Sequence, residues 1–188
     1  CPAWADQAGK SPVKVFILAG QSNMEGHGMV SIPASTKNQG KGTLEYLVKD
    51  PKTAKQYKHT IDENGDWAVR DDVWVTYFEN KGNHTVGFGG GRNKDLIGPE
   101  YQFGHVMGDY FDNQVLIIKA AWGGKTLAGD FRPPSRGGQP GPYYKEMLEH
   151  VREVLANLEK YFPTTTAGDT RSPGSAGTRG GTTGAACS

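Results

Sequence analysis

The hydropathy pattern of the chain contains two short, nearly continuous apolar runs. Residues 13–19 (VKVFILA) and 115–118 (VLII) are rich in β-branched side chains and show no regular polar alternation. Such runs are typical of strands buried on both faces of a parallel sheet. We therefore predict two buried parallel strands, which lead into glycine-containing turns at residues 20–24 and 123–126.

Two further segments have the apolar periodicity of amphipathic helices. The first opens with Gly98-Pro99-Glu100, since proline suits the first helical turn and an acidic residue favours the positive end of the helix dipole. Its predicted apolar face consists of Phe103, Val106, Met107 and Tyr110. The second helix covers residues 143–161, with Met147, Val151, Val154, Leu155 and Leu158 at helical spacing. The order strand, helix, strand, helix predicts an α/β domain with right-handed crossovers.

Between the first strand and the first helix the sequence is polar and rich in turn residues. Residues 25–95 therefore read as a long insertion, which contains one convincing strand at residues 73–78 (VWVTYF). The insertion ends in the glycine run 87–91. No lysine-serine pair or helix signal follows that run in the register of a phosphate-binding loop, so we expect a flexible loop.

Composition narrows the classes of partner. The 188 residues suit one domain, and 21 lysines and arginines against 20 aspartates and glutamates include no basic block that would attract nucleic acid or an anionic membrane. No apolar run approaches the roughly 20 residues of a membrane-spanning helix. Cys1 and Cys187 suggest neither a disulfide framework nor a metal site, and no cofactor is expected. Ala3-Trp4-Ala5 has the form of a signal-peptidase site, so residues 1–5 are interpreted as the end of an export signal, for a periplasmic or extracellular product, or as an alanine-rich start without that role.

The candidate chemistry lies in the turn after the first strand. In a parallel sheet, ligands bind beyond the carboxyl ends of the strands, so residues 20–24 and 123–126 are expected to face one cleft. Ser22, two residues after Gly20, can present its hydroxyl for attack on a carbonyl while nearby backbone N–H groups bind the oxyanion. The alternative is that Ser22 only caps the following helix.

The surrounding residues carry a family resemblance. The stretches LAGQSNMEGHG, IGPEYQFGHVMGD and IIKAAWGGKTL resemble, in order and spacing, three landmarks of the sialate O-acetylesterase-like carbohydrate esterases of the SGNH hydrolase superfamily. The resemblance covers residues 13–162. It implies a three-layer, flavodoxin-like parallel sheet, incomplete at the C-terminus of this chain, and a serine esterase acting on an acetylated carbohydrate.

The resemblance also implies residue roles. Ser22 is similar to the nucleophile, and its own N–H would be one oxyanion donor, with Gly124 or, less favoured, Gly123 as the second. Gln21 and Asn23 match the same landmark and are expected to hold hydrogen bonds of the loop. Glu100 matches the GPE landmark, for which a structural role at the helix start is expected.

The general base is missing from this pattern. Similar enzymes take it from a D-x-x-H block near the carboxyl end, and none of the five histidines has an aspartate three residues before it. His27 and His105 lie close to the landmarks, and we interpret them as an ordinary loop histidine and an ordinary helix histidine; the alternative for each is a displaced base. The remaining three are predicted on the surface: His59, His84 and His150.

Residues 164–188 contain no leucine, isoleucine, valine, methionine or aromatic residue. One interpretation is a disordered linker. The other is a reading-frame slip near the codon of Pro163: a shifted frame over residues 171–183 admits E-(I/V)-A-G-F-G-W-(H/Y)-Q-G-W-N-D, a strand followed by the W-x-Q-G block that the resemblance implies. Residues 6–163 then form the N-terminal part of an esterase domain, followed by an out-of-frame or truncated tail.

The leading hypothesis is a carbohydrate O-acetylesterase, of which this chain would be a fragment with little turnover because it lacks the base. The alternative is a non-catalytic carbohydrate-binding or interaction module on an esterase scaffold. Its candidate sugar-stacking residues are Trp67, Trp74, Tyr77, Tyr143 and Tyr144. A flavodoxin-like nucleotide binder fits the fold but lacks phosphate-specific residues.

Overall fold

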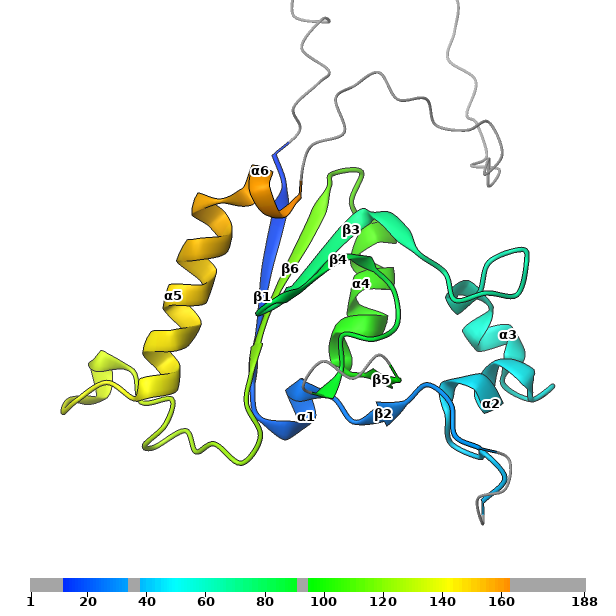
Figure 1. Ribbon diagram of the computed structural model, residues 1–188, viewed down its shortest axis with the longest axis horizontal. Coiled ribbons are helices and arrows are strands. Elements are labelled where there is room, and N and C mark those ends of the chain that lie inside the picture. The colour runs from blue at the N-terminus through cyan, green and yellow to red at the C-terminus, as the bar shows by residue number, and fades with distance from the viewer. Residues whose placement is uncertain (1–11, 34–37, 91–94, 163–188) are drawn as a thin grey trace, which may run out of the picture.

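The computed structural model describes residues 12–33, 38–90 and 95–162 and shows a three-layer α/β arrangement (Figure 1). The proposed signal end, both cysteines and the tail 164–188 lie outside the described residues. The strands are β1 (Lys14–Gly20), β2 (Gly28–Met29), β3 (Arg70–Tyr77), β4 (Asn80–His84), β5 (Leu96–Ile97) and β6 (Val115–Ala121). The helices are α1 (Ser22–Glu25), α2 (Leu44–Lys49), α3 (Ala54–Tyr57), α4 (Pro99–Tyr110), α5 (Pro142–Ala156) and α6 (Leu158–Tyr161), with short 3₁₀ turns at Lys58–Thr60 and Pro134–Arg136.

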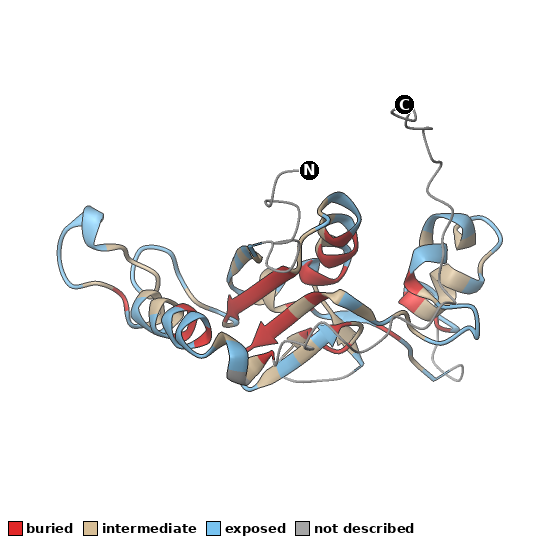
Figure 2. Cartoon of the chain, turned by 90° about the horizontal axis from the view of Figure 1, so that it is seen from above, coloured by how far each residue is buried: buried red, intermediate tan, exposed pale blue. Residues whose placement is uncertain are grey.

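The main sheet has the order β1-β6-β3-β4, in which β6 is parallel to both neighbours and β4 is antiparallel to β3. All seven residues of β6 are buried, and Figure 2 shows the buried residues concentrated in the central strands. One hydrophobic cluster joins the sheet to α4 through Phe103 and Met107, and the other joins it to α5 through Val151 and Val154. The predicted α/β class with flanking helices is therefore confirmed.

The prediction that the strand at residues 13–19 is buried on both faces is wrong. In β1, half-buried residues alternate with exposed ones, and Val15 and Ile17 are 39% and 50% exposed. The reason is that β1 pairs only with β6 among the described strands, while the cluster beneath α5 is built on β6 and β3 and does not include these two side chains. Phe16 and Leu18 instead pack on the α4 side.

The predicted insertion contributes two strands to the main sheet. The expected strand at residues 73–78 is found as β3, which pairs with β6 and buries Val73, Val75 and Tyr77 in the core. Asn80–His84 turns back as β4. Only the part around α2 and α3 lies to one side of the sheet (Figure 1).

The described part of the glycine run is packed rather than loose. Gly87, Phe88 and Gly89 are buried, and the Gly90 N–H donates to the Gly26 carbonyl at 2.6 Å. A Cβ at Gly89 would overlap the backbone of Leu96, so the absence of a side chain allows this close approach. The expectation of a flexible loop is therefore wrong for residues 87–90.

The two long helices differ in detail from their predicted faces. In α4, Val106 and Tyr110 are exposed, and the most buried residues are Glu100, Tyr101, Gly104, His105 and Gly108. Glu100 and Tyr101 occupy this face because Lys119 of the sheet and the Thr60 carbonyl give them partners, which a count of apolar positions does not detect. The buried His105 ring packs against other rings, and its Nε2 has no hydrogen-bond partner. The second helix is interrupted at Asn157, so residues 143–161 are divided between α5 and α6, and Leu155 is 46% exposed.

The close packing around Gly104 leads to a prediction about the stability of the protein. Its Cα lies against the buried His84 ring, so a methyl group there would overlap the imidazole. Alanine raises helix propensity by about 1 kcal/mol over glycine, but overpacking costs typically 1–3 kcal/mol. We therefore expect Gly104→Ala to lower the free energy of unfolding in urea titrations, whereas Val106→Ala on the exposed side of the same helix should change it little. An unchanged or higher stability of Gly104→Ala would contradict this packing.

Candidate active site

Ser22 lies in the turn that follows β1, at the carboxyl end of the parallel strands. It is the first residue of the four-residue helix α1. Gly20 precedes this turn, and a Cβ on Gly20 would lie 2.7 Å from the Met24 Cβ. Glycine at this position therefore lets α1 fold back close to the end of β1. Met24 in turn packs into the core cluster on the α4 side, which anchors the turn.

The Ser22 hydroxyl is not used to cap α1. The N-cap position is occupied by Gln21, whose side chain makes no capping hydrogen bond. Ser22 itself is half-buried, and its carbonyl accepts the Gly26 N–H at 3.0 Å. Gln21 and Asn23 have exposed side chains, and Gln21 contributes its carbonyl oxygen to the Glu25 N–H at 2.8 Å. The capping interpretation of Ser22 is therefore not supported by this geometry.

The turn after β6 lies beside the Ser22 turn, as the parallel register predicts. Gly20 pairs with Ala121, and the Trp122 N–H donates to the Gly20 carbonyl at 3.2 Å. A Cβ on Gly123 would lie 2.8 Å from a carboxylate oxygen of Glu25. Gly124 has φ +70°, in the left-handed region that favours glycine, with open space where a Cβ would be. Both predicted glycines are exposed, so their backbone is accessible to a ligand.

An ion pair beneath these turns joins Lys119 of β6 to Glu100 of α4. The ammonium nitrogen lies 2.6 Å from Glu100 Oε2, and the two side chains are 0% and 1% exposed. The same nitrogen donates to the carbonyl oxygens of Glu25 at 2.8 Å and Phe88 at 2.6 Å. Glu100 Oε1 accepts the Gly98 N–H at 2.8 Å. One ammonium therefore holds together the end of α1, the glycine run and the start of α4.

The hydrogen bonds indicate that this pair is charged. Burial raises the pKa of Glu100 and lowers the pKa of Lys119, and the attraction between the two opposes both shifts. The three hydrogen bonds of Lys119 use all three protons of an ammonium group, whereas a neutral amine would supply only two. The structural role expected for Glu100 at the helix start is therefore accompanied by a buried ion pair. Sequence reasoning missed Lys119, although a lysine within an otherwise apolar strand was the available signal.

None of the five histidines hydrogen-bonds to the Ser22 hydroxyl, and the structure describes all five. His27 is exposed, with its Nε2 3.7 Å from a Glu25 carboxylate oxygen. His59 is exposed, as predicted, and its ring packs edge-on against His105 at 4.9 Å between centroids.

Two histidines predicted on the surface are buried. His84 is 0% exposed, stacks on Tyr101 and packs edge-on against His105 at 4.8 Å between centroids. His150 is 7% exposed and packs on Phe78. Both belong to contacts between distant segments, which local sequence does not reveal.

The candidate sugar-stacking aromatics have different environments. Trp74 stacks on Phe162 with ring centroids 4.7 Å apart, inside the core. Tyr77 is buried and its hydroxyl donates to the Ala121 carbonyl at 3.0 Å. These two side chains are therefore packing residues, whereas Trp67 lines a surface hollow.

A group of aromatic side chains lies beside the turn after β6. Trp122 packs against Tyr143 and Phe131, with centroids 5.1 Å and 5.8 Å apart. The Lys125 ammonium lies 4.5 Å above the Tyr143 ring, a cation–π contact. Tyr144 is half-buried on the same helix.

Within the described residues, no three histidine, cysteine, aspartate or glutamate side chains are grouped so that they could hold a metal ion. The same residues include no helix that is long and apolar enough to cross a membrane.

Comparison with known proteins decides the family. The family model for carbohydrate esterases described as sialic acid-specific acetylesterases matches residues 12–164, most of the chain. The chain belongs to this family. The match includes the Ser22 turn, Glu100 and the Gly123-Gly124 turn, which the fold brings to one end of the sheet.

Comparison with individual proteins gives less information about the chain than the family model does. No curated protein matches the chain. A protein from Arabidopsis thaliana, solved by X-ray crystallography, is 16% identical, with a TM-score of 0.41 over 76% of this chain. The chain matches 51% of the length of that protein, so it spans about half of it.

Proposed function

We propose that Ser22 is the nucleophile of a carbohydrate O-acetylesterase. The observation that carries the proposal is the position of Ser22: the residue is half-buried, its hydroxyl does not cap α1, and its turn lies next to the turn that contains Gly123 and Gly124. Membership in a family of carbohydrate esterases supports the substrate class, an acetylated carbohydrate.

The proposed reaction has two steps. Ser22 Oγ attacks the acetyl carbonyl carbon, its proton passes to a base, and the sugar oxygen leaves as an alcohol after protonation. Water then attacks the acetyl-serine, which releases acetate and restores the hydroxyl. The negative oxygen formed in each step would be bound by the Ser22 N–H and the Gly124 N–H, with Gly123 as the alternative donor.

In our proposal, this chain does not supply the general base that takes the proton of Ser22. His27 is five residues from Ser22 but is mostly exposed and pairs with Glu25. We propose that the base and its orienting carboxylate belong to a D-x-x-H block that would follow the corrected reading frame. Removing a member of a serine hydrolase triad costs on the order of 10⁴-fold or more, so we expect this chain to show little turnover.

A serine-directed phosphonate tests the proposal. We expect slow labelling of this chain at Ser22, located by peptide mass spectrometry, and labelling at least about 100-fold faster in a gene product with the frame restored. Ser22→Ala should abolish labelling in both proteins, whereas Ser135→Ala, an exposed serine in the Pro134–Arg136 turn, should leave it unchanged. Absence of labelling at Ser22 in both proteins would exclude the esterase and favour a non-catalytic carbohydrate-binding module.

A further inference from the structure

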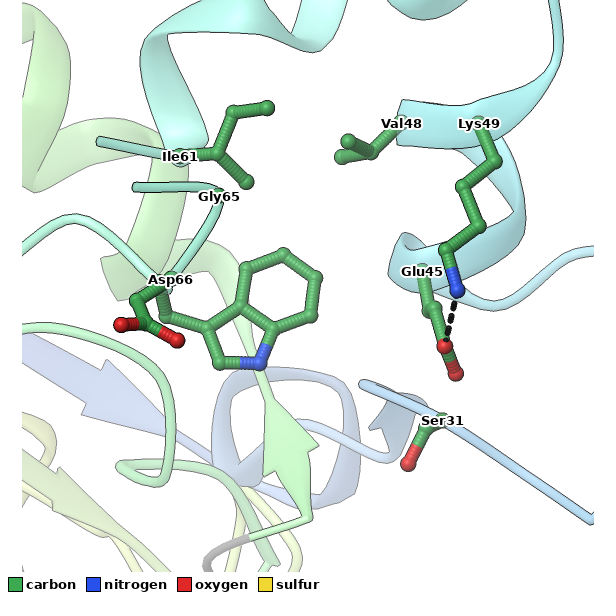
Figure 3. A pocket seen from close by; sticks show the side chains of 8 residues that line it. Ser31, Glu45, Val48, Lys49, Ile61, Gly65 and Asp66 are labelled. Carbon is green, nitrogen blue, oxygen red and sulfur yellow. Dashed lines mark hydrogen bonds and ion pairs between the residues drawn. The ribbon is translucent and has the colours of Figure 1, made fainter. Parts of the chain in front are cut away.

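A hollow of about 280 Å³ lies in the segment between β2 and β3, outside the turns that hold Ser22 and Gly124. Its apolar wall is formed by Trp67, Ile61 and Val48. Figure 3 shows Ile61 and Asp66 on one side of the hollow, facing the side chains of α2, with Ser31 at its edge. The hollow is thus formed by three chain segments of the predicted insertion.

Hydrogen bonds hold the segment of residues 61–67 in place. Asp62 Oδ1 accepts the N–H groups of Asn64 and Asp66, both at 2.9 Å, and Ile61 pairs with Trp67 in an antiparallel bridge. This tight turn fixes the backbone position of Trp67, which carries the indole ring.

The opposite wall is anchored at the start of α2. The Thr43 hydroxyl accepts the Tyr46 N–H at 3.2 Å, and the Glu45 N–H donates to the Val30 carbonyl at 2.9 Å. The hollow is therefore formed before any ligand binds, which reduces the entropy cost of binding.

The lining combines an aromatic surface with hydrogen-bonding groups of both kinds. A pyranose ring has an apolar C–H face that can pack on an indole, and hydroxyl groups around its edge that both donate and accept. Trp67 and Ile61 offer the apolar surface, while Ser31 and Asp66 offer a hydroxyl and a carboxylate.

Charge indicates which sugars would enter. The Lys49 ammonium is paired with Glu45 Oε1 at 2.5 Å, so the one cation of the lining is already neutralised by a carboxylate. Asp66 adds a second carboxylate. An acidic sugar would meet this net negative charge, whereas an uncharged pyranose would not.

We propose that this hollow is a binding subsite for one uncharged pyranose unit of the carbohydrate that carries the acetyl group, an inference that rests on the proposed function. Ser31 follows Ser22 by nine residues, which limits the separation of their Cα atoms to about 30 Å. A polysaccharide chain long enough to span that distance could occupy both the hollow and the Ser22 turn. The subsite would hold an acetylated polysaccharide while its acetyl group is presented at Ser22.

Titration of the Ser22→Ala protein with xylotetraose, cellotetraose and free sialic acid, followed by isothermal calorimetry, measures this site without turnover. We expect a neutral oligosaccharide to bind with a Kd of roughly millimolar order and sialic acid, whose single pyranose ring carries a carboxylate, to bind more weakly. Adding Trp67→Ala should raise the Kd for the neutral oligosaccharide by about tenfold. Tyr110→Ala, which removes an aromatic ring that is 76% exposed on α4, should not change it.

A second measurement leaves the hollow unmutated, so its result does not depend on whether Trp67→Ala folds. In two-dimensional NMR the Trp67 indole N–H resonance should shift with added oligosaccharide, while that of Trp74, stacked in the core, should not. An unshifted Trp67 resonance, or binding that Trp67→Ala leaves unchanged, would overturn the subsite. The labelling of Ser22 is independent: saccharide binding at Trp67 without labelling would leave the subsite standing and reject the esterase.

Discussion

Lys119→Met is expected to lower the free energy of unfolding by about 3–5 kcal/mol, because it leaves a buried carboxylate without its partner. Glu100 is 1% exposed, so water cannot replace the ammonium. The carbonyl oxygens of Glu25 and Phe88 lose a donor in the same variant. The loss is a large part of the 5–15 kcal/mol that stabilises a typical domain, and urea unfolding followed by circular dichroism would measure it.

The chain offers a matched control for this variant. Lys49→Met removes an i,i+4 ion pair with Glu45 in which the side chains are 72% and 41% exposed, and we expect a change of at most about 0.5 kcal/mol. The double variant Lys119→Met/Glu100→Leu should recover part of the loss, because it removes the unpaired charge. A loss below about 1 kcal/mol in Lys119→Met would contradict the stabilising role of the pair.

Mild acid is expected to destabilise the protein through its buried histidines. Burial lowers the pKa of His84 to about 4 and the pKa of His105 to about 3. The charge of the neighbouring His84 also lowers the pKa of His105. In the unfolded chain both should titrate near the ordinary value of about 6.5. The unfolded state therefore binds more protons between those values, and stability falls as the pH drops below about 6.5.

The size of this acid effect follows from the same shifts. Each histidine contributes up to about 1.4 kcal/mol per pH unit below its unfolded pKa, so the two together should cost roughly 4 kcal/mol between pH 7 and pH 5. Urea midpoints measured across that interval test the prediction. His84→Gln should reduce the slope, whereas His59→Ala, at an exposed position, should alter it little. A stability independent of pH over this interval would show that the histidines titrate normally in the folded state.

The candidate site was predictable from sequence because its parts are local. A strand-Gly-x-Ser turn and a strand-Gly-Gly turn need only the parallel arrangement of two strands to become neighbours, and the register of β1 with β6 supplies it. Helix α4 was likewise located by its proline and its periodicity.

The errors concern features that depend on which elements become neighbours. β1 has the composition of a fully covered strand, yet Val15 and Ile17 are exposed because β1 has one described neighbour and α5 packs elsewhere. β3 and β4 were assigned to an insertion because strand composition does not reveal the sheet to which a strand belongs.

The sequence by itself determined the α/β class, the positions of the principal strands and helices, and the Ser22 turn, since hydrophobic periodicity and glycine placement act over a few residues. Only the tertiary structure decided that Lys119 and Glu100 pair beneath that turn, that His84 is buried against Gly104, and that Trp67 lines a hollow. Each of these depends on contacts between residues far apart in the chain. A polar side chain is stable in the interior only where such a contact gives it a partner, and local sequence does not show which partner will arrive.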